Sequence, residues 1–263
     1  MLKLNAIPES YKEFYGKNAE QMSKLIADGR VPMNTSQLMQ IRLDSRNYPE
    51  EVKTAWMDNF FDTGDAVIYH PNGDVKIVLD SQALREMTYK SQRNIGALVL
   101  DEDVYKTLQG EVFKKGKFGK INDGMSREDV KVHPIWRVLA RDQALLNDST
   151  DLIFAEGQER FGYNLAMGVS LGSCSGNNPE MRAWFVGKLG YSSYVCGVGD
   201  IAICYGRFVG IAPNASSVRD KCALDIKAYS MADLLAFDKA IKGLEGTLHP
   251  DILNPFKELR KKL

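Results

Sequence analysis

The stretch from residue 168 to residue 212 constrains the fold most, because glycines repeatedly interrupt its apolar, β-forming segments. It reads GVSLGSCSGNNPEMRAWFVGKLGYSSYVCGVGDIAICYGRFVGIA. Short apolar runs bounded by glycine are typical of β-strands joined by tight turns. Arg182 and Arg207 each lie directly beside large apolar residues, where a guanidinium needs a partner or an edge in water. We therefore predict a β-rich region that forms the wall of a binding pocket.

The composition is that of a soluble globular protein. The chain has 263 residues, of which 44% are hydrophobic and 26% charged, and 34 Lys and Arg residues balance 34 Asp and Glu residues. Neither half is strongly basic, so we expect no nucleic-acid partner. No apolar stretch approaches the roughly 20 residues that span a bilayer, and the N-terminus lacks the apolar core of a signal peptide. We expect a cytoplasmic protein with no membrane partner.

The cysteine pattern predicts neither a metal site nor a disulfide framework. Cys174, Cys196, Cys204 and Cys222 form no C-x-x-C pair, and structural zinc sites normally show close ligand pairs. We expect reduced, mostly packed thiols, no bound metal and no cofactor.

The first half of the chain predicts three helices followed by a hairpin. Helical spacing of apolar residues indicates a helix over 8–28, a second from a cap at Asn34 or Thr35 through Arg46, and a third beginning at Pro49. Segments 65–70 and 75–80 flank an Asn-Gly dipeptide, which is a strong signal for a β-hairpin turn.

Further elements follow the hairpin. We predict a strand over 95–100, a helix beginning at Pro134 within 133–148 and a helix over 149–161. Two more helices are predicted near the C-terminus, over 230–243 and 249–263.

Strands and helices do not alternate regularly, so the pattern favours an α+β fold with helices flanking small, mostly antiparallel sheet regions. An α/β-hydrolase-like fold is the alternative. We expect one integrated domain over 1–263, with possible subdomains 1–125 and 126–263.

The segment Asp62-Thr63-Gly64-Asp65 resembles the Thr-Gly-Asp segment of adenylate-forming enzymes, in which the aspartate holds the ribose hydroxyls of the nucleotide. The glycine-rich phosphate loop of that family has no counterpart upstream. The segment also resembles the Asp-Thr-Gly of aspartic proteases, whose chemistry requires a second copy. We favour a turn from a helix into a strand, in which Asp62 and Asp65 bind local amides.

The run from Gly172 to Gly176, GSCSG, resembles the nucleophile elbow of α/β-hydrolases in its dienelactone-hydrolase-like cysteine form. The resemblance implies Cys174 as nucleophile and His249 as its base, with Asp200 orienting the histidine. Asp220 and Asp225 are alternatives to Asp200.

Arg182 and Arg207 are candidate ligand-binding residues, because a planar guanidinium binds carboxylate or phosphate in a bidentate manner. Internal pairing, for instance with Asp200 or Glu180, is the alternative. Arg137 and Arg141 share one face of the predicted helix, and the neighbouring Asp142 favours an internal charge network there.

Two function classes remain. One is an enzyme or small-molecule-binding protein with its site in the 168–212 region, with a cysteine hydrolase as its sharpest form and an anionic group as the favoured ligand. The other is a non-catalytic interaction or assembly module, which would present an oligomer or a broad apolar surface.

Overall fold

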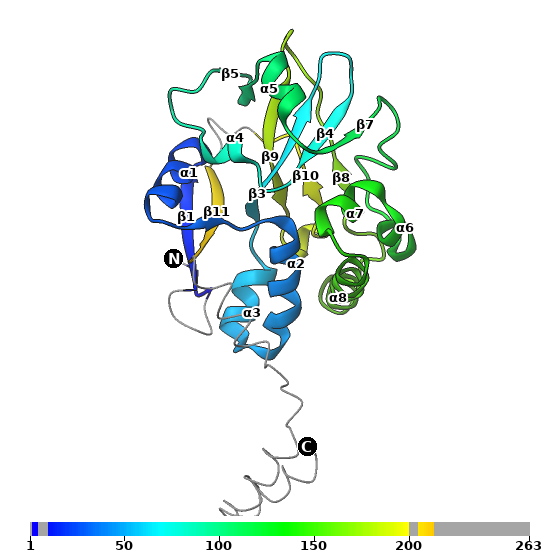
Figure 1. Ribbon diagram of the computed structural model, residues 1–263. Coiled ribbons are helices and arrows are strands. Elements are labelled where there is room, and N and C mark those ends of the chain that lie inside the picture. The colour runs from blue at the N-terminus through cyan, green and yellow to red at the C-terminus, as the bar shows by residue number, and fades with distance from the viewer. Residues whose placement is uncertain (1, 5–9, 200–204, 213–263) are drawn as a thin grey trace, which may run out of the picture. The chain divides into compact units, whose positions relative to one another are not determined.

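The computed structural model describes residues 2–4, 10–199 and 205–212 (Figure 1), which belong to the first of the two units into which the chain divides, Met1–Pro213. The helices are α1 (Asn18–Ala27), α2 (Thr35–Asp44), α3 (Glu50–Met57), α4 (Gln82–Arg85), α5 (Glu102–Thr107), α6 (Arg127–Val132), α7 (Pro134–Ala140) and α8 (Gln143–Phe161), with 3-10 turns η1 (Ser45–Asn47) and η2 (Leu189–Tyr191). The strands are β1 (Tyr11–Lys17), β2 (Val31–Pro32), β3 (Phe61–Tyr69), β4 (Val75–Val78), β5 (Arg93–Asn94), β6 (Ala97–Val99), β7 (Glu111–Phe113), β8 (Val169–Ser170), β9 (Glu180–Val186), β10 (Val195–Cys196) and β11 (Tyr205–Ile211). The helices predicted over 230–243 and 249–263 lie outside the described residues.

The described strands form one mixed sheet with the order β1-β11-β3-β9-β10-β8. Strands β11 and β3, and strands β10 and β8, pair in parallel, while the remaining pairs are antiparallel. In Figure 1, β1 and β11 lie on one side of the central strands β3 and β9, and β8 and β10 on the other. The sheet brings the first and last described strands next to each other.

The α+β prediction is confirmed, but the two predicted sheet regions are one sheet. Strand β3, from the predicted hairpin, pairs along much of its length with β9, from the glycine-rich region. The register shifts between Asp62 and Ala66, which marks a β-bulge in the central strand. The single-domain prediction for the whole chain stays a prediction.

The helix predicted over 8–28 is wrong in its first half, where residues 11–17 form β1. Strand β1 pairs with β11 from Tyr11↔Ile211 to Lys17↔Tyr205. Phe14 and Gly16 are buried, whereas Tyr15 and Lys17 are exposed, which is the alternation of a strand. The spacing of the apolar residues is compatible with a helix or a strand. Residues 11–17 form a strand because β11, at the far end of the described chain, pairs with them.

The buried core joins α1 and α4 to one face of the sheet. Met22 and Leu25 of α1 and Leu84 of α4 pack in one cluster with apolar side chains of β3, β9 and β11. Helices α2, α7 and α8 pack against one another as a separate helical layer.

The boundary between the predicted helices over 133–148 and 149–161 is also wrong. Helix α7 ends at Ala140, Arg141 adopts a left-handed conformation with φ 65°, and α8 begins at Gln143. The Asp142 side chain caps α8 by accepting a hydrogen bond from the Leu145 amide at 2.7 Å. A local cap and a left-handed residue therefore divide the helices six residues before the predicted break.

Other local predictions are confirmed. The hairpin forms between β3 and β4, from Ala66↔Val78 to Tyr69↔Val75. Asn34 caps α2 in a reciprocal capping box with Gln37.

Candidate ligand-binding surface

The Asp62-Thr63-Gly64-Asp65 segment lies inside β3 and does not form the predicted turn. Asp65 is fully buried and accepts hydrogen bonds from the Thr35 amide at 2.8 Å and the Asp80 amide at 3.0 Å. These amides are distant in sequence, so the prediction of local amide partners is wrong. The carboxylate instead joins the start of α2 and the end of the hairpin to the central strand.

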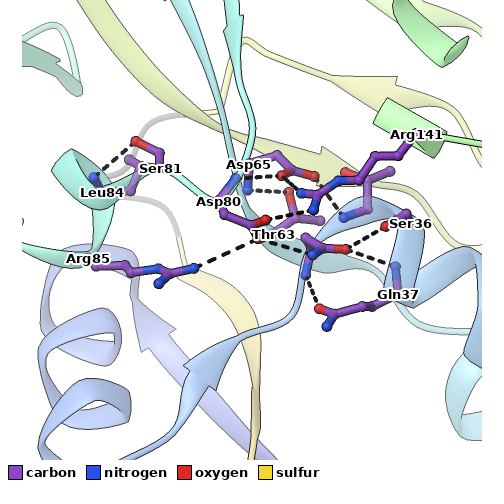
Figure 2. Close-up of polar contacts among 11 residues, drawn as sticks. Ser36, Gln37, Thr63, Asp65, Asp80, Ser81, Leu84, Arg85 and Arg141 are labelled. Carbon is purple, nitrogen blue, oxygen red and sulfur yellow. Dashed lines mark hydrogen bonds and ion pairs between the residues drawn. The ribbon is translucent and has the colours of Figure 1, made fainter. Parts of the chain in front are cut away.

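Arg141 completes this network, as Figure 2 shows. Its guanidinium donates to Asp65 Oδ1 at 2.8 Å and to Asp80 Oδ2 at 2.6 Å. Asp80 Oδ1 also accepts a hydrogen bond from Asn34 Nδ2 at 3.0 Å. The predicted internal charge network around Arg141 exists, but its partners are Asp65 and Asp80 rather than Asp142. Because both carboxylates are occupied by protein groups, this network stabilises the fold and offers no free acid.

Asp62 is a second buried carboxylate, and its partners are different. It accepts hydrogen bonds from Asn18 Nδ2 at 3.0 Å and the Arg207 amide at 2.7 Å. Loss of solvation outweighs these bonds and raises the pKa of Asp62 to about 6.

Arg207 is one of the two predicted anion-binding residues, and protein groups surround it. Its Nε lies 2.7 Å from Glu13 Oε1, and its Nη1 donates to Asn59 Oδ1 at 2.7 Å. The guanidinium lies against the rings of Tyr15 and Phe60. These contacts favour the internal-pairing alternative for Arg207.

Arg182, the other predicted anion-binding residue, is buried in β9 and donates to backbone carbonyls. Nη1 donates to Gly199 O at 2.9 Å and Nη2 to Ile95 O at 2.7 Å. Val198 O lies 3.5 Å from Nη1. Arg182 and Arg207 share none of these partners, so the contacts do not place the two guanidiniums on one ligand.

Cys174 lies in the loop between β8 and β9, half-buried, with Sγ close to the carbonyls of Gly176 at 3.3 Å and Asn178 at 3.1 Å. Burial raises the pKa of the Cys174 thiol. The loop leads into β9, whereas a nucleophile elbow leads into a helix. The elbow geometry is therefore absent around Cys174. His249, Asp200 and the alternatives Asp220 and Asp225 lie outside the described residues, so the triad stays a prediction.

The loop that carries Cys174 and the strand β9 that carries Arg182 both contact the turn between β5 and β6. Ser175 Oγ and Glu180 Oε1 both lie within hydrogen-bond distance of Asn94 Nδ2, at 3.1 and 2.7 Å. The next residue, Ile95, accepts the Arg182 bond described above. Burial opposes ionisation of Glu180, but bonds from Asn94 and Ser175 hold its pKa below the ordinary value. The turn thus bonds Arg182 through Ile95, and through Asn94 it bonds Ser175, the residue after Cys174.

Ile95 is the most unusual residue of this turn. It and Gly96 are the two central residues, with φ 42° and 70°, and both strands pair across them. Positive φ at both positions defines a type I′ turn, for which Asn-Gly is strongly preferred and a β-branched residue is strained. Ile95 is also 71% exposed to solvent. Val198, whose carbonyl lies near the Arg182 guanidinium, is 46% exposed.

We call Asn94, Ile95, Cys174, Ser175 and Val198 the Ile95 surface. Sequence reasoning found Cys174 and the underlying Arg182 but missed Asn94 and Ile95. One feature of the sequence could have indicated this surface. Ile95 precedes Gly96 between two short β-forming segments, at a position where turns usually have a residue such as asparagine.

The described ranges contain neither a cluster of metal ligands nor a helix that could span a membrane. Among residues 2–4, 10–199 and 205–212, no three His, Cys, Asp or Glu side chains cluster so that they could hold a metal ion. In the same part of the chain, no helix has the length and apolar character needed to cross a bilayer.

Comparisons with known proteins identify the fold. No family model matches the sequence, and no curated protein matches it. A solved structure described as "Accommodation of massive sequence variation in Nanoarchaeota by the C-type lectin fold" is similar, with a TM-score of 0.61 and 16% identity over 79% of this chain and 100% of that chain. That structure has the C-type lectin fold, and the sheet of this chain is mixed rather than parallel, so the α/β-hydrolase-like alternative has no support in the fold. The described part of this chain has the C-type lectin fold.

Proposed function

We propose that this chain is a non-catalytic binding protein that recognises an apolar patch on another protein through the Ile95 surface. The observation that carries the proposal is a strained, exposed isoleucine in a turn where asparagine would relieve the strain. Strained backbone positions persist where the surrounding structure holds them, and they cluster at functional sites.

Arg182 fixes the backbone of the turn that carries Ile95. It is buried beneath the turn and bonds the carbonyls of Ile95 and Gly199. A charged donor strengthens these bonds, so the exposed side chains of Ile95 and Val198 stand on a fixed backbone. Preorganised apolar side chains lose little conformational freedom on binding, which favours affinity.

The chemistry of the surface argues for an apolar protein partner rather than an anion. Its polar groups, Asn94 and Ser175, are neutral, and the neighbouring charges of Glu180 and Arg182 are buried and bonded. The Arg182 guanidinium already donates to backbone carbonyls from both terminal nitrogens, which leaves it less capacity for a carboxylate or phosphate. The interaction-module class therefore fits the geometry better than the anion-binding or hydrolase class.

The similar structure supports the same class indirectly. It is described as showing that the C-type lectin fold accommodates massive sequence variation in Nanoarchaeota. A scaffold that tolerates varied side chains suits recognition, because loops can change while the sheet and helices hold the backbone.

The test uses random peptides displayed on phage, selected on the full-length protein. Selected peptides are then measured against Ile95→Asn, Val198→Ser and, as a control, Val132→Ser. Val132 is equally apolar and 68% exposed, but it lies on α6. We expect the dissociation constant to rise about tenfold or more for the first two variants, as for hot-spot residues, and to stay constant for the control.

Peptides whose binding depends on neither Ile95 nor Val198 would overturn the proposal. A selection that yields no binding peptide would overturn it equally, because a preformed apolar recognition site captures peptides readily. Catalytic turnover that requires Cys174 would replace it with the hydrolase hypothesis.

A further inference from the structure

A small pocket lies inside the helical layer, away from the Ile95 surface. Side chains of α2, α7 and α8 line it together with residues from the end of β9 and from the loops before β8 and β10. Its volume of about 10 Å³ is close to what one water molecule requires. Most of its lining is apolar, with Trp136 and Ile153 among the contributors, so a polar occupant must be held by a few specific groups.

Two hydroxyl groups of the lining have no partner. Thr35 Oγ1, at the start of α2, and Ser193 Oγ, before β10, have no hydrogen-bond partner within the described structure, although the two residues are 0% and 1% exposed. Buried hydroxyls are normally paired, and an unpaired one costs a substantial desolvation penalty. Both groups can donate and accept, which matches the bonding capacity of a water molecule.

Arg42 gives the pocket a charged wall. It is buried and donates to the carbonyls of Trp56 at 3.1 Å, Asn59 at 3.2 Å and Gly187 at 3.0 Å. Desolvation lowers its pKa to about 10, so the guanidinium stays charged at neutral pH. Three carbonyl dipoles already face this cation, which favours a neutral dipolar occupant over an anion.

We infer that this pocket binds one ordered water molecule, held by the Thr35 and Ser193 hydroxyls beside Arg42. The water would link the first residue of α2 to the loop before β10. The backbone of that loop is unusual, because Ser192 and Ser193 both have positive φ, 59° and 47°.

The first test compares Thr35→Val and Ser193→Ala, which remove the hydroxyls with little change in shape. If water bonds them, each variant leaves the water with fewer partners, and the folding equilibrium constant falls about tenfold. If the pocket is dry, each variant removes an unpaired polar group and raises the folding equilibrium constant, which would overturn the inference.

The second test counts long-lived water molecules by oxygen-17 relaxation dispersion. The wild-type protein should have one more such water than the double variant Thr35→Val with Ser193→Ala. The control is Thr150→Val, whose hydroxyl is buried but bonds the Leu146 carbonyl. This variant should keep the water, and equal counts in the wild type and the double variant would overturn the inference.

A halide titration separates water from an anion. Thermal stability is measured in sodium chloride and in sodium gluconate at equal ionic strength, for the wild type and the double variant. We expect the midpoint of thermal unfolding to be the same in both salts. Stabilisation by chloride that the double variant lacks would overturn the water in favour of a bound anion.

Discussion

Arg141 Nη2 lies 2.8 Å from Oδ1 of the fully buried Asp65, so the residue that separates α7 from α8 is bonded to the central strand. The same guanidinium reaches Asp80, whose amide also donates to Asp65. One side chain therefore connects the helical layer, the hairpin and the sheet.

Replacing Arg141 should be costly. In Arg141→Ala the buried Asp65 keeps its amide donors but loses its cation, and breaking a buried pair costs about 3 kcal/mol of unfolding free energy. Arg141→Gly should lose about 1 kcal/mol less, because glycine tolerates the left-handed backbone. Urea unfolding measures both, with the exposed Arg137→Ala as control. A loss in Arg141→Ala no greater than in Arg137→Ala would contradict this role.

The strain at Ile95 predicts a gain in stability on substitution. Ile95→Asn should raise the unfolding free energy by about 1 kcal/mol, because asparagine tolerates positive φ and the exposed isoleucine loses little packing. Thermal and urea unfolding measure the gain, and Val132→Ser is again the matched surface control. A destabilised Ile95→Asn would show that the isoleucine is retained for folding rather than for binding.

The raised pKa of Asp62 predicts a specific pH dependence. The folded state binds the proton more tightly than the unfolded state, whose pKa is near the ordinary 3.8. Asp62 therefore destabilises the fold above pH 6, and this cost disappears as the pH falls from about 6 towards 3.8. Between pH values well below 3.8 and well above 6, the contribution of Asp62 to the unfolding free energy should change by an amount on the order of 3 kcal/mol.

Asp62→Asn isolates this effect, since asparagine does not titrate. The unfolding free energy of the variant minus that of the wild type should be more positive at pH 7.5 than at pH 4.5. Urea unfolding across this range gives the difference directly. A difference that does not change with pH would mean that Asp62 has the same pKa in both states.

Cys174 should be a slow nucleophile at neutral pH. Burial raises its pKa above the ordinary 9.0, and the thiolate is the reactive form. Iodoacetamide labelling, followed by peptide mass spectrometry to separate the four cysteines, should be slower at Cys174 than at glutathione and should accelerate above pH 9. A labelling midpoint below pH 8 would instead support the cysteine-hydrolase hypothesis.

The sequence by itself determined the elements whose hydrogen bonds join residues only a few positions apart. The hairpin around Asn72-Gly73 and the Asn34 cap are correct because their donors and acceptors are neighbours in the chain. The β-rich character of the 168–212 region was also readable, since glycines divide its apolar segments. Arg182 and Cys174 were recognised as unusual from their neighbours alone.

Only the tertiary structure decided the features whose partners are far away. Residues 11–17 became a strand because β11 pairs with them, and the helix break at Arg141 is bonded to a carboxylate 76 residues away. The Ile95 surface likewise needs Asn94 and Ser175, which are separated by 81 residues. The local sequence sets the propensity of each segment to form a helix or a strand. A buried charge or a strand edge also needs a hydrogen-bonding partner, and only the tertiary fold determines which distant residue provides it.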